Sequence, residues 1–246
     1  MVGSLILRGL LVGFVAALLA FGCAKFIGEP QVDRAIAFEA QMDAAKGEAP
    51  EPEIVSREVQ STVGLLTGVL VYGTAIGGLF ALVFAFASGR VGRIGPRGLA
   101  ALLALAGFLA VIFVPQLKYP ANPPSVGDPE TIGLRTQLFF VMIAASIASM
   151  VGAINLGLRL KQHLGAWNAT LTAAAAFVLV IAAVQLLLPD VNEVPEDFPA
   201  VVLWRFREAS LAMQIVLWGG IGLGFGWLTE RSASRQFRFS RPARAH

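Results

Sequence analysis

The stretch VGLLTGVLVYGTAIGGLFALVFAFA, residues 63–87, decides the fold class because no charged side chain interrupts it. A helix that crosses the roughly 30 Å hydrocarbon core of a bilayer needs about 20 predominantly apolar residues. The composition of the whole chain agrees, since 56% of the 246 residues are hydrophobic, 14% are charged and the mean hydropathy is +0.71. The sequence therefore predicts an integral membrane protein rather than a soluble domain.

Six segments of the chain are long and apolar enough to span a membrane. They are residues 5–27, 63–87, 99–117, 137–158, 170–188 and 209–228. Backbone polar groups must be satisfied within the segment in lipid, and the alternating segments of about ten residues that mark a barrel are absent, so helices are expected. We predict an all-α bundle of about six transmembrane helices, with five as the alternative, forming one polytopic domain over residues 1–230 and a basic tail over 231–246.

Charged residues separate between the connections of the predicted spans. Arginine and lysine gather at Arg8, in the connections after the second and fourth spans, and in the tail. The first connection holds eight acids against three bases, and the fifth holds five acids against two. The positive-inside rule then predicts a multi-pass protein of the cytoplasmic (inner) membrane, with both termini inside and external loops at residues 28–62, 118–136 and 189–208.

The basic side chains account for the sequence pI of about 9.4 without a nucleic-acid partner. They lie on short connections that flank the membrane and on the tail, which can add attraction to anionic lipid. The lipid bilayer is the partner that this charge pattern indicates, and no nucleic-acid role is expected.

Catalytic motifs are missing from the sequence. The only histidines are His163, in a predicted cytoplasmic connection, and His246, at the terminus, so no Ser-His-Asp set can form on the outer side. A zinc-binding H-E-x-x-H helix and a phosphate-binding P-loop are absent as well. Tyr72 is the one ionisable side chain near the middle of a span, which argues against an internal proton relay. We expect neither an enzyme nor a permanently bound cofactor.

Small residues recur at four-residue spacing in GLLVG (9–13), GLLTG (64–68), GTAIG (73–77) and GIGLG (220–224). Such spacing lets helix backbones approach closely. These faces could pack within the chain or could dock another membrane subunit, and the sequence leaves both readings open.

The middle external loop is rich in proline and carries oxygen-bearing side chains. Five prolines lie in this loop and at the end of the preceding span, Pro115, Pro120, Pro123, Pro124 and Pro129, and they fix φ and predict a rigid, extended cap. Carboxylate, amide and carbonyl oxygens suit hard or borderline divalent cations. One interpretation is that Asn122, Asp128 and Glu130 face the mouth of an ion pathway, with Arg135 holding a carboxylate of this loop or the next.

Simpler interpretations exist for these and the other polar groups at the predicted outer side. Lys118 and Tyr119 could anchor the third span at the membrane interface. Trp204, Arg205, Arg207 and Glu208, at the start of the last span, could be an aromatic belt with basic flanks. Glu29, Asp33 and Glu39 begin a predicted amphipathic helix in the first loop, where they belong either to the pathway mouth or to a solvated face.

Three stretches resemble the CbtA family of probable cobalt transporter subunits. They are GEPQVDRAIAFE (28–39), PQLKYPANPPSVGDPETIGLRT (115–136) and LWRFREASL (203–211), and LKYPANPP (117–124) is the most specific part. The likeness covers nearly the whole chain in order. It implies a cytoplasmic-membrane protein, usually described with five spans, that handles cobalt as a transported substrate, often under cobalamin control. Our six segments depart from that count.

The resemblance also implies a single-span partner subunit that bears a histidine motif. Imidazole suits late transition metals, and the predicted outer face of this chain has none. We therefore expect the partner to capture the ion and this chain to form the transmembrane path. The alternative is a non-transporting accessory or assembly subunit of a larger membrane complex.

Overall fold

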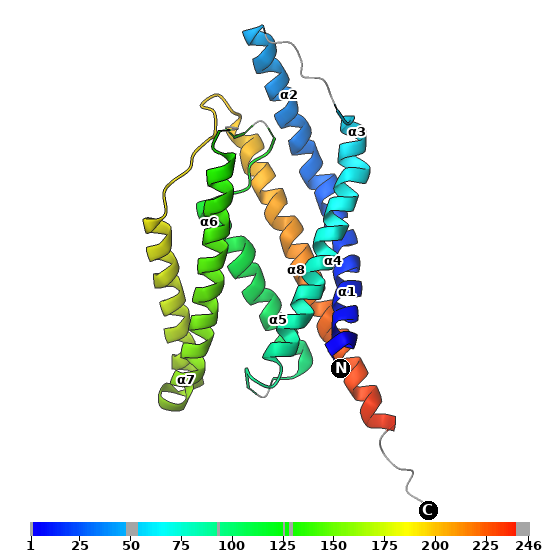
Figure 1. Cartoon of the computed structure of the whole chain (residues 1–246), viewed down its shortest axis with the longest axis vertical. Coiled ribbons are helices and arrows are strands. Elements are labelled where there is room, and N and C mark those ends of the chain that lie inside the picture. The colour runs from blue at the N-terminus through cyan, green and yellow to red at the C-terminus, as the bar shows by residue number, and fades with distance from the viewer. Residues whose placement is uncertain (1, 48–53, 93, 125, 128–129, 240–246) are drawn as a thin grey trace, which may run out of the picture. The chain divides into compact units, whose positions relative to one another are not determined.

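The computed structural model describes residues 2–47, 54–92, 94–124, 126–127 and 130–239, the last seven of these by their backbone alone (Figure 1). All regular elements in these ranges are helical, which confirms the predicted all-α class. Five helices are long and apolar enough to cross a membrane: Val2–Lys46, Arg57–Ala87, Pro96–Lys118, Ile132–Leu187 and Ala200–Ser232.

Helix α7, Ile132–Leu187, contains two of the six predicted segments because it folds back on itself. Its 56 residues would extend about 84 Å as one straight helix, nearly three times the hydrocarbon core. Gly165 breaks the helix with φ 74° and ψ 167°, a combination that is essentially restricted to glycine. Met142 and Ile181 then share one core cluster, so the two arms run side by side (Figure 1). The predicted segments 137–158 and 170–188 therefore correspond to the two arms of α7 on either side of Gly165.

The first helix continues beyond residue 27, where the first predicted span ends, and runs through Pro30. α1 (Val2–Cys23), the π-helical turn η1 (Ala24–Gly28) and α2 (Glu29–Lys46) follow one another without a break. Proline lacks the N–H that would bond to the carbonyl four residues earlier, and for Pro30 that carbonyl lies within η1. The turn η3 (Phe108–Phe113), between α5 (Pro96–Gly107) and α6 (Val114–Lys118), precedes Pro115 in the same way. Pro189, in contrast to Pro30 and Pro115, lies outside its helix, two residues after Leu187, the last residue of α7.

Helices also extend into the predicted loops at other points. α3 (Arg57–Val59), η2 (Gln60–Gly64) and α4 (Leu65–Ala87) form one continuous run, so the first predicted loop is helical at both of its ends. Helix α8, Ala200–Phe239, begins nine residues before the predicted sixth span. The backbone N–H groups of Val202 and Leu203 already bond to the carbonyl of Pro199, which starts the helix there.

The chain divides into two compact units. The first comprises residues 1–22, 58–105 and 213–246, and its core contains Phe80, Phe84 and Phe225. The ring centroids of Phe80 and Phe84 lie 5.4 and 5.0 Å from that of Phe225. Glycines bring α1 and α4 into backbone contact, since a Cβ on Gly77 would lie 2.7 Å from the Cα of Gly13. This glycine spacing therefore serves packing within the chain.

The second unit comprises residues 23–57 and 106–212 and contains all the described candidate site residues. One of its core clusters is formed by Val114, Tyr119, Met142 and Ile181. The other joins Ala35 of α2, Val126 and Phe198, with the Phe38 and Phe198 ring centroids 5.1 Å apart. The second cluster packs α2 against the two connections at residues 119–131 and 188–199.

Candidate functional site

The proline-rich connection 119–131 begins where α6 ends, and local geometry fixes that end. The N–H of Tyr119 closes the last helical turn on the carbonyl of Pro115 at 2.9 Å. Tyr119 itself leaves the helix with φ −125° and ψ 79°. The ring of the following Pro120 disfavours a helical conformation at the residue before it. The sequence LKYP therefore sets both the end of the helix and the direction of the loop.

Two residues at this helix end contact the next connection of the same unit. The hydroxyl of Tyr119 donates to the carbonyl oxygen of Pro189 at 2.8 Å, and the ammonium of Lys118 donates to Asp190. Tyr119 is only 4% exposed because it packs in the first core cluster. Burial raises the pKa of the Tyr119 phenol, an effect that the charge of Lys118 opposes and that of Asp190 reinforces.

The far end of the same loop is fixed by Glu193. Its carboxylate accepts from the guanidinium of Arg135 and from the hydroxyl of Thr131. The Glu193 side chain is 6% exposed and that of Arg135 is 31% exposed, so water screens this pair poorly. The sequence suggested that Arg135 would hold a carboxylate of its own loop or of the next one, and the partner is in the next one.

Arg207 of α8 holds the middle of the loop. Its guanidinium donates to the carbonyl of Ala121 at 3.3 Å and to the side-chain oxygen of Asn122 at 2.9 Å. Asn122 is thereby engaged by a cation of the chain itself. Between these contacts lies a cavity of about 240 Å³ whose lining is formed by Gln116, Tyr119, Pro120, Ala121, Asn122, Arg135, Thr136 and Phe139.

Glu29 and Asp33, at the start of α2, are held by Arg57. The guanidinium of Arg57 contacts the carboxylate of Glu29 and reaches that of Asp33 at 3.0 Å. The Glu29 side chain is 11% exposed and that of Asp33 is 62% exposed. Arg57 is one of three bases among the eight acids of this predicted loop. Its pairing reduces the negative charge that the two carboxylates present to solvent.

The remaining candidates are not brought to one point by the described structure. Glu39 and Glu130 are exposed, and Asp128 lies outside the described residues. At the start of α8, Trp204 is 63% exposed and Arg205 contacts Glu208 at 3.4 Å. Within the described ranges, no three histidine, cysteine or carboxylate side chains come close enough to hold a metal ion together.

Sequence reasoning therefore missed the groups that position the loop. Asp190, Glu193 and the carbonyl of Pro189 all belong to the connection after α7, and Arg57 precedes α4. Their sequence signal was the presence of both acids and bases in the predicted outer connections. That signal predicts ion pairs in general, but it does not say which acid contacts which base.

A protein-family model described as probable cobalt transporter subunit (CbtA) matches residues 2–230. The chain belongs to the CbtA family. No curated protein and no solved structure shows a match to the chain. Membership of the CbtA family, together with the apolar helices, establishes a multi-pass membrane protein of a probable cobalt transporter. The string LKYPANPP, which carries the resemblance most strongly, supplies Lys118, Tyr119, Ala121 and Asn122 to the loop contacts described above.

Proposed function

We propose that this CbtA chain forms the transmembrane path of a cobalt uptake system and receives the ion from a small histidine-bearing partner subunit. The match of the family model over residues 2–230 is the observation that carries the proposal. The helical fold supports it, because five long apolar helices suit a membrane-embedded subunit. In this arrangement, cobalt is the substrate that passes through and is not a resident cofactor.

The distribution of metal ligands supports the division of labour between two subunits. Imidazole nitrogen suits cobalt, and the chain has only His163 and His246. His163 lies close to the Gly165 turn of α7, at the end of the second unit opposite the proline-rich loop (Figure 1). In sequence, the connections 118–136 and 188–208 at the loop end contain no histidine or cysteine, whereas they carry several carboxylates. We therefore assign the tight capture of the ion to the partner subunit. Tight and specific binding of cobalt by the purified chain alone would contradict this assignment.

The proposed pathway mouth rests on the proline-rich loop. Its three-point attachment through Tyr119, Arg135 and Arg207 holds the loop at a fixed place in the second unit. Of the acids suggested for the mouth, Glu29 and Asp33 contact Arg57, which offsets their negative charge. Asp128 and Glu130, the carboxylates of the proline-rich loop itself, are assigned the main role in attracting the cation, with Glu39 as a further contributor.

Cobalt uptake in cells that lack the gene provides the test. Wild type should restore uptake of labelled cobalt, and Asp128→Asn combined with Glu130→Gln should not, with membrane protein levels equal and nickel present as a competitor. The matched control is Glu196→Gln combined with Asp197→Asn, which removes two exposed carboxylates from the next connection. Equal loss in both double variants would show a general charge effect and would contradict the proposed mouth.

The second candidate is a non-transporting accessory or assembly subunit. It is favoured by one observation, namely that the predicted spans contain no ionisable side chain near their middle except Tyr72. The same uptake experiment separates the two functions, because an accessory subunit should tolerate loss of both loop carboxylates. Unchanged uptake when the gene is absent would exclude the transport function and favour the accessory one.

A further inference from the structure

A groove of about 440 Å³ follows the two arms of α7. Its lining comes from the first arm (Met150, Ala153, Ile154, Gly157, Leu158, Lys161), the second arm (Ala166, Thr170, Ala173, Ala174, Phe177) and Leu109 of η3. Small side chains form its floor, because Gly157 and Ala173 pack closely enough that a Cβ on Gly157 would lie 3.2 Å from that of Ala173. The volume falls within the range of about 300–1,000 Å³ that is typical of small-molecule sites.

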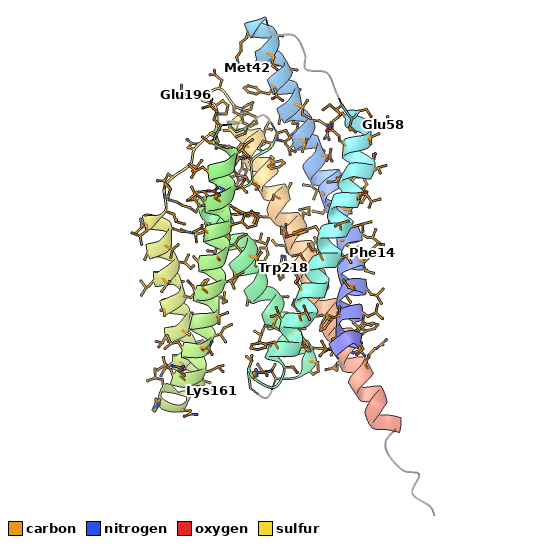
Figure 2. All side chains as sticks on the ribbon, in the orientation of Figure 1. Phe14, Met42, Glu58, Lys161, Glu196 and Trp218 are labelled. Carbon is orange, nitrogen blue, oxygen red and sulfur yellow. The ribbon has the colours of Figure 1, made fainter. Side chains whose placement is uncertain are left out.

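The chemistry of the groove is apolar along its length and cationic at one end. The only hydroxyl in its lining, that of Thr170, already donates to the carbonyl of Ala166 within the helix at 2.8 Å. Lys161 lies at the end next to the Gly165 turn (Figure 2). No carboxylate occurs anywhere in the sequence of α7, and within the described residues none forms an ion pair with Lys161. This end of the groove is therefore complementary to an anion.

The length of the groove matches one leaflet of a bilayer. Along the first arm it extends from Lys161 to Met150, eleven residues, which corresponds to about 16 Å of helix. Half of a hydrocarbon core of roughly 30 Å is about 15 Å. A transmembrane helix of another subunit would be expected to pack over both leaflets, whereas a single acyl chain needs only one.

We propose that this groove binds an anionic glycerophospholipid, with an acyl chain along the small side chains of the two arms and the phosphate at Lys161. Basic pockets between transmembrane helices on the cytoplasmic side are known to hold acidic lipid head groups. The positive-inside rule predicts that the turn carrying Arg159, Lys161 and His163 lies on that side. In the whole of α7 the buried residues are Met142, Ser146, Ala169, Ala173 and Ile181, so lipid can reach much of both arms directly.

The purified full-length chain in neutral detergent can test the proposal. Native mass spectrometry would count bound lipid during titration with phosphatidylglycerol or phosphatidylcholine of identical acyl chains. Wild type should prefer phosphatidylglycerol, and Lys161→Gln should lower that preference about fivefold, as expected for one basic residue near a lipid surface. Arg159→Gln is the matched control, because Arg159 has the same charge two residues away but does not line the groove.

A second pair of variants tests the acyl chain separately from the charge. Ala174 is exposed and lines the groove, so Ala174→Leu should fill it and reduce bound lipid of both kinds. Ala175 is also exposed but does not line the groove, so Ala175→Leu should leave lipid binding unchanged. Circular dichroism would verify equal helical content in all variants.

Two results would overturn the lipid assignment. One is an equal effect of Lys161→Gln and Arg159→Gln, which would indicate unspecific attraction to the basic turn. The other is a loss of a co-purifying membrane subunit in Ala174→Leu with lipid occupancy unchanged, which would assign the groove to a protein partner instead.

Discussion

Tyr119 and Pro189 join two connections that are 70 residues apart in the chain, through a hydrogen bond of 2.8 Å from the phenol to the backbone carbonyl. The phenol ring lies in a core cluster with Val114, Met142 and Ile181. The proline-rich loop starts at this tyrosine, so a buried side chain fixes its origin. The rigidity of the loop therefore depends on packing and on contacts with the next connection as well as on its prolines.

Replacement of Tyr119 by phenylalanine tests the hydrogen bond while it keeps the ring. We expect Tyr119→Phe to lower the free energy of unfolding by about 1–3 kcal/mol, because the variant loses one bond and leaves the Pro189 carbonyl without this donor. Tyr119→Leu should cost more, since it also removes ring packing. Denaturant unfolding of the purified protein in detergent would measure both. Equal stability of wild type and Tyr119→Phe would show that the bond contributes nothing net.

The pH dependence of stability should reveal the same phenol. Burial raises its pKa above the ordinary value of 10.0, so the folded state holds this proton more tightly than the unfolded state does. The resulting stabilisation is complete below pH 10 and is lost as pH rises from 10 through the folded pKa. Wild type should therefore lose stability in this alkaline range faster than Tyr119→Phe, as measured by unfolding at a series of pH values. Parallel curves for the two proteins would contradict the prediction.

Glu193 should matter far more than the neighbouring acid Glu196. Glu193→Gln removes the charge that faces Arg135, while the amide keeps the size of the side chain. We expect a loss of about 1–3 kcal/mol in the free energy of unfolding, because a poorly hydrated guanidinium loses its charged partner. Glu196 is exposed on the same connection (Figure 2), so Glu196→Gln should change stability by less than about 0.5 kcal/mol. Similar losses in both variants would show that the contact with Arg135 is unimportant.

Composition and charge were sufficient to predict the membrane class and the six apolar segments, because lipid imposes a strict length and polarity on any spanning helix. They could not predict that the first helix would continue beyond residue 27 and through Pro30, although the third predicted span, residues 99–117, already included Pro115. A proline usually ends or kinks a helix, and whether a π-turn absorbs it depends on packing that no local pattern encodes.

The candidate site was predicted only in outline. Loop stiffness and the pairing of Arg135 with a carboxylate of one of two loops followed from residue types. The identity of that partner, Glu193, depends on contacts between residues 58 apart, and the contact of Arg207 with Asn122 spans 85 residues. The counts of charged residues indicate that acids and bases will pair, but they do not show which two residues come into contact. For the same reason the sequence placed Glu29 and Asp33 either at the pathway mouth or on a solvated face and did not predict that Arg57 contacts both.

The glycines of α4 provide the last prediction, because residue spacing alone does not distinguish GLLTG (64–68) from GTAIG (73–77). A Cβ on Gly77 would lie 2.7 Å from the Cα of Gly13, a backbone atom that cannot move aside. We expect Gly77→Ala to lower the free energy of unfolding by about 1–3 kcal/mol, as overpacking commonly does.

Gly68 is the matched control on the same helix, since a Cβ there would meet nothing within 4 Å. Gly68→Ala should be neutral or should stabilise the protein by up to about 1 kcal/mol, because alanine favours a helix over glycine. Unfolding of both variants in the same detergent would measure the difference. A loss in Gly68→Ala as large as that in Gly77→Ala would contradict the open space around Gly68 and would show that close glycine packing is not what separates the two positions.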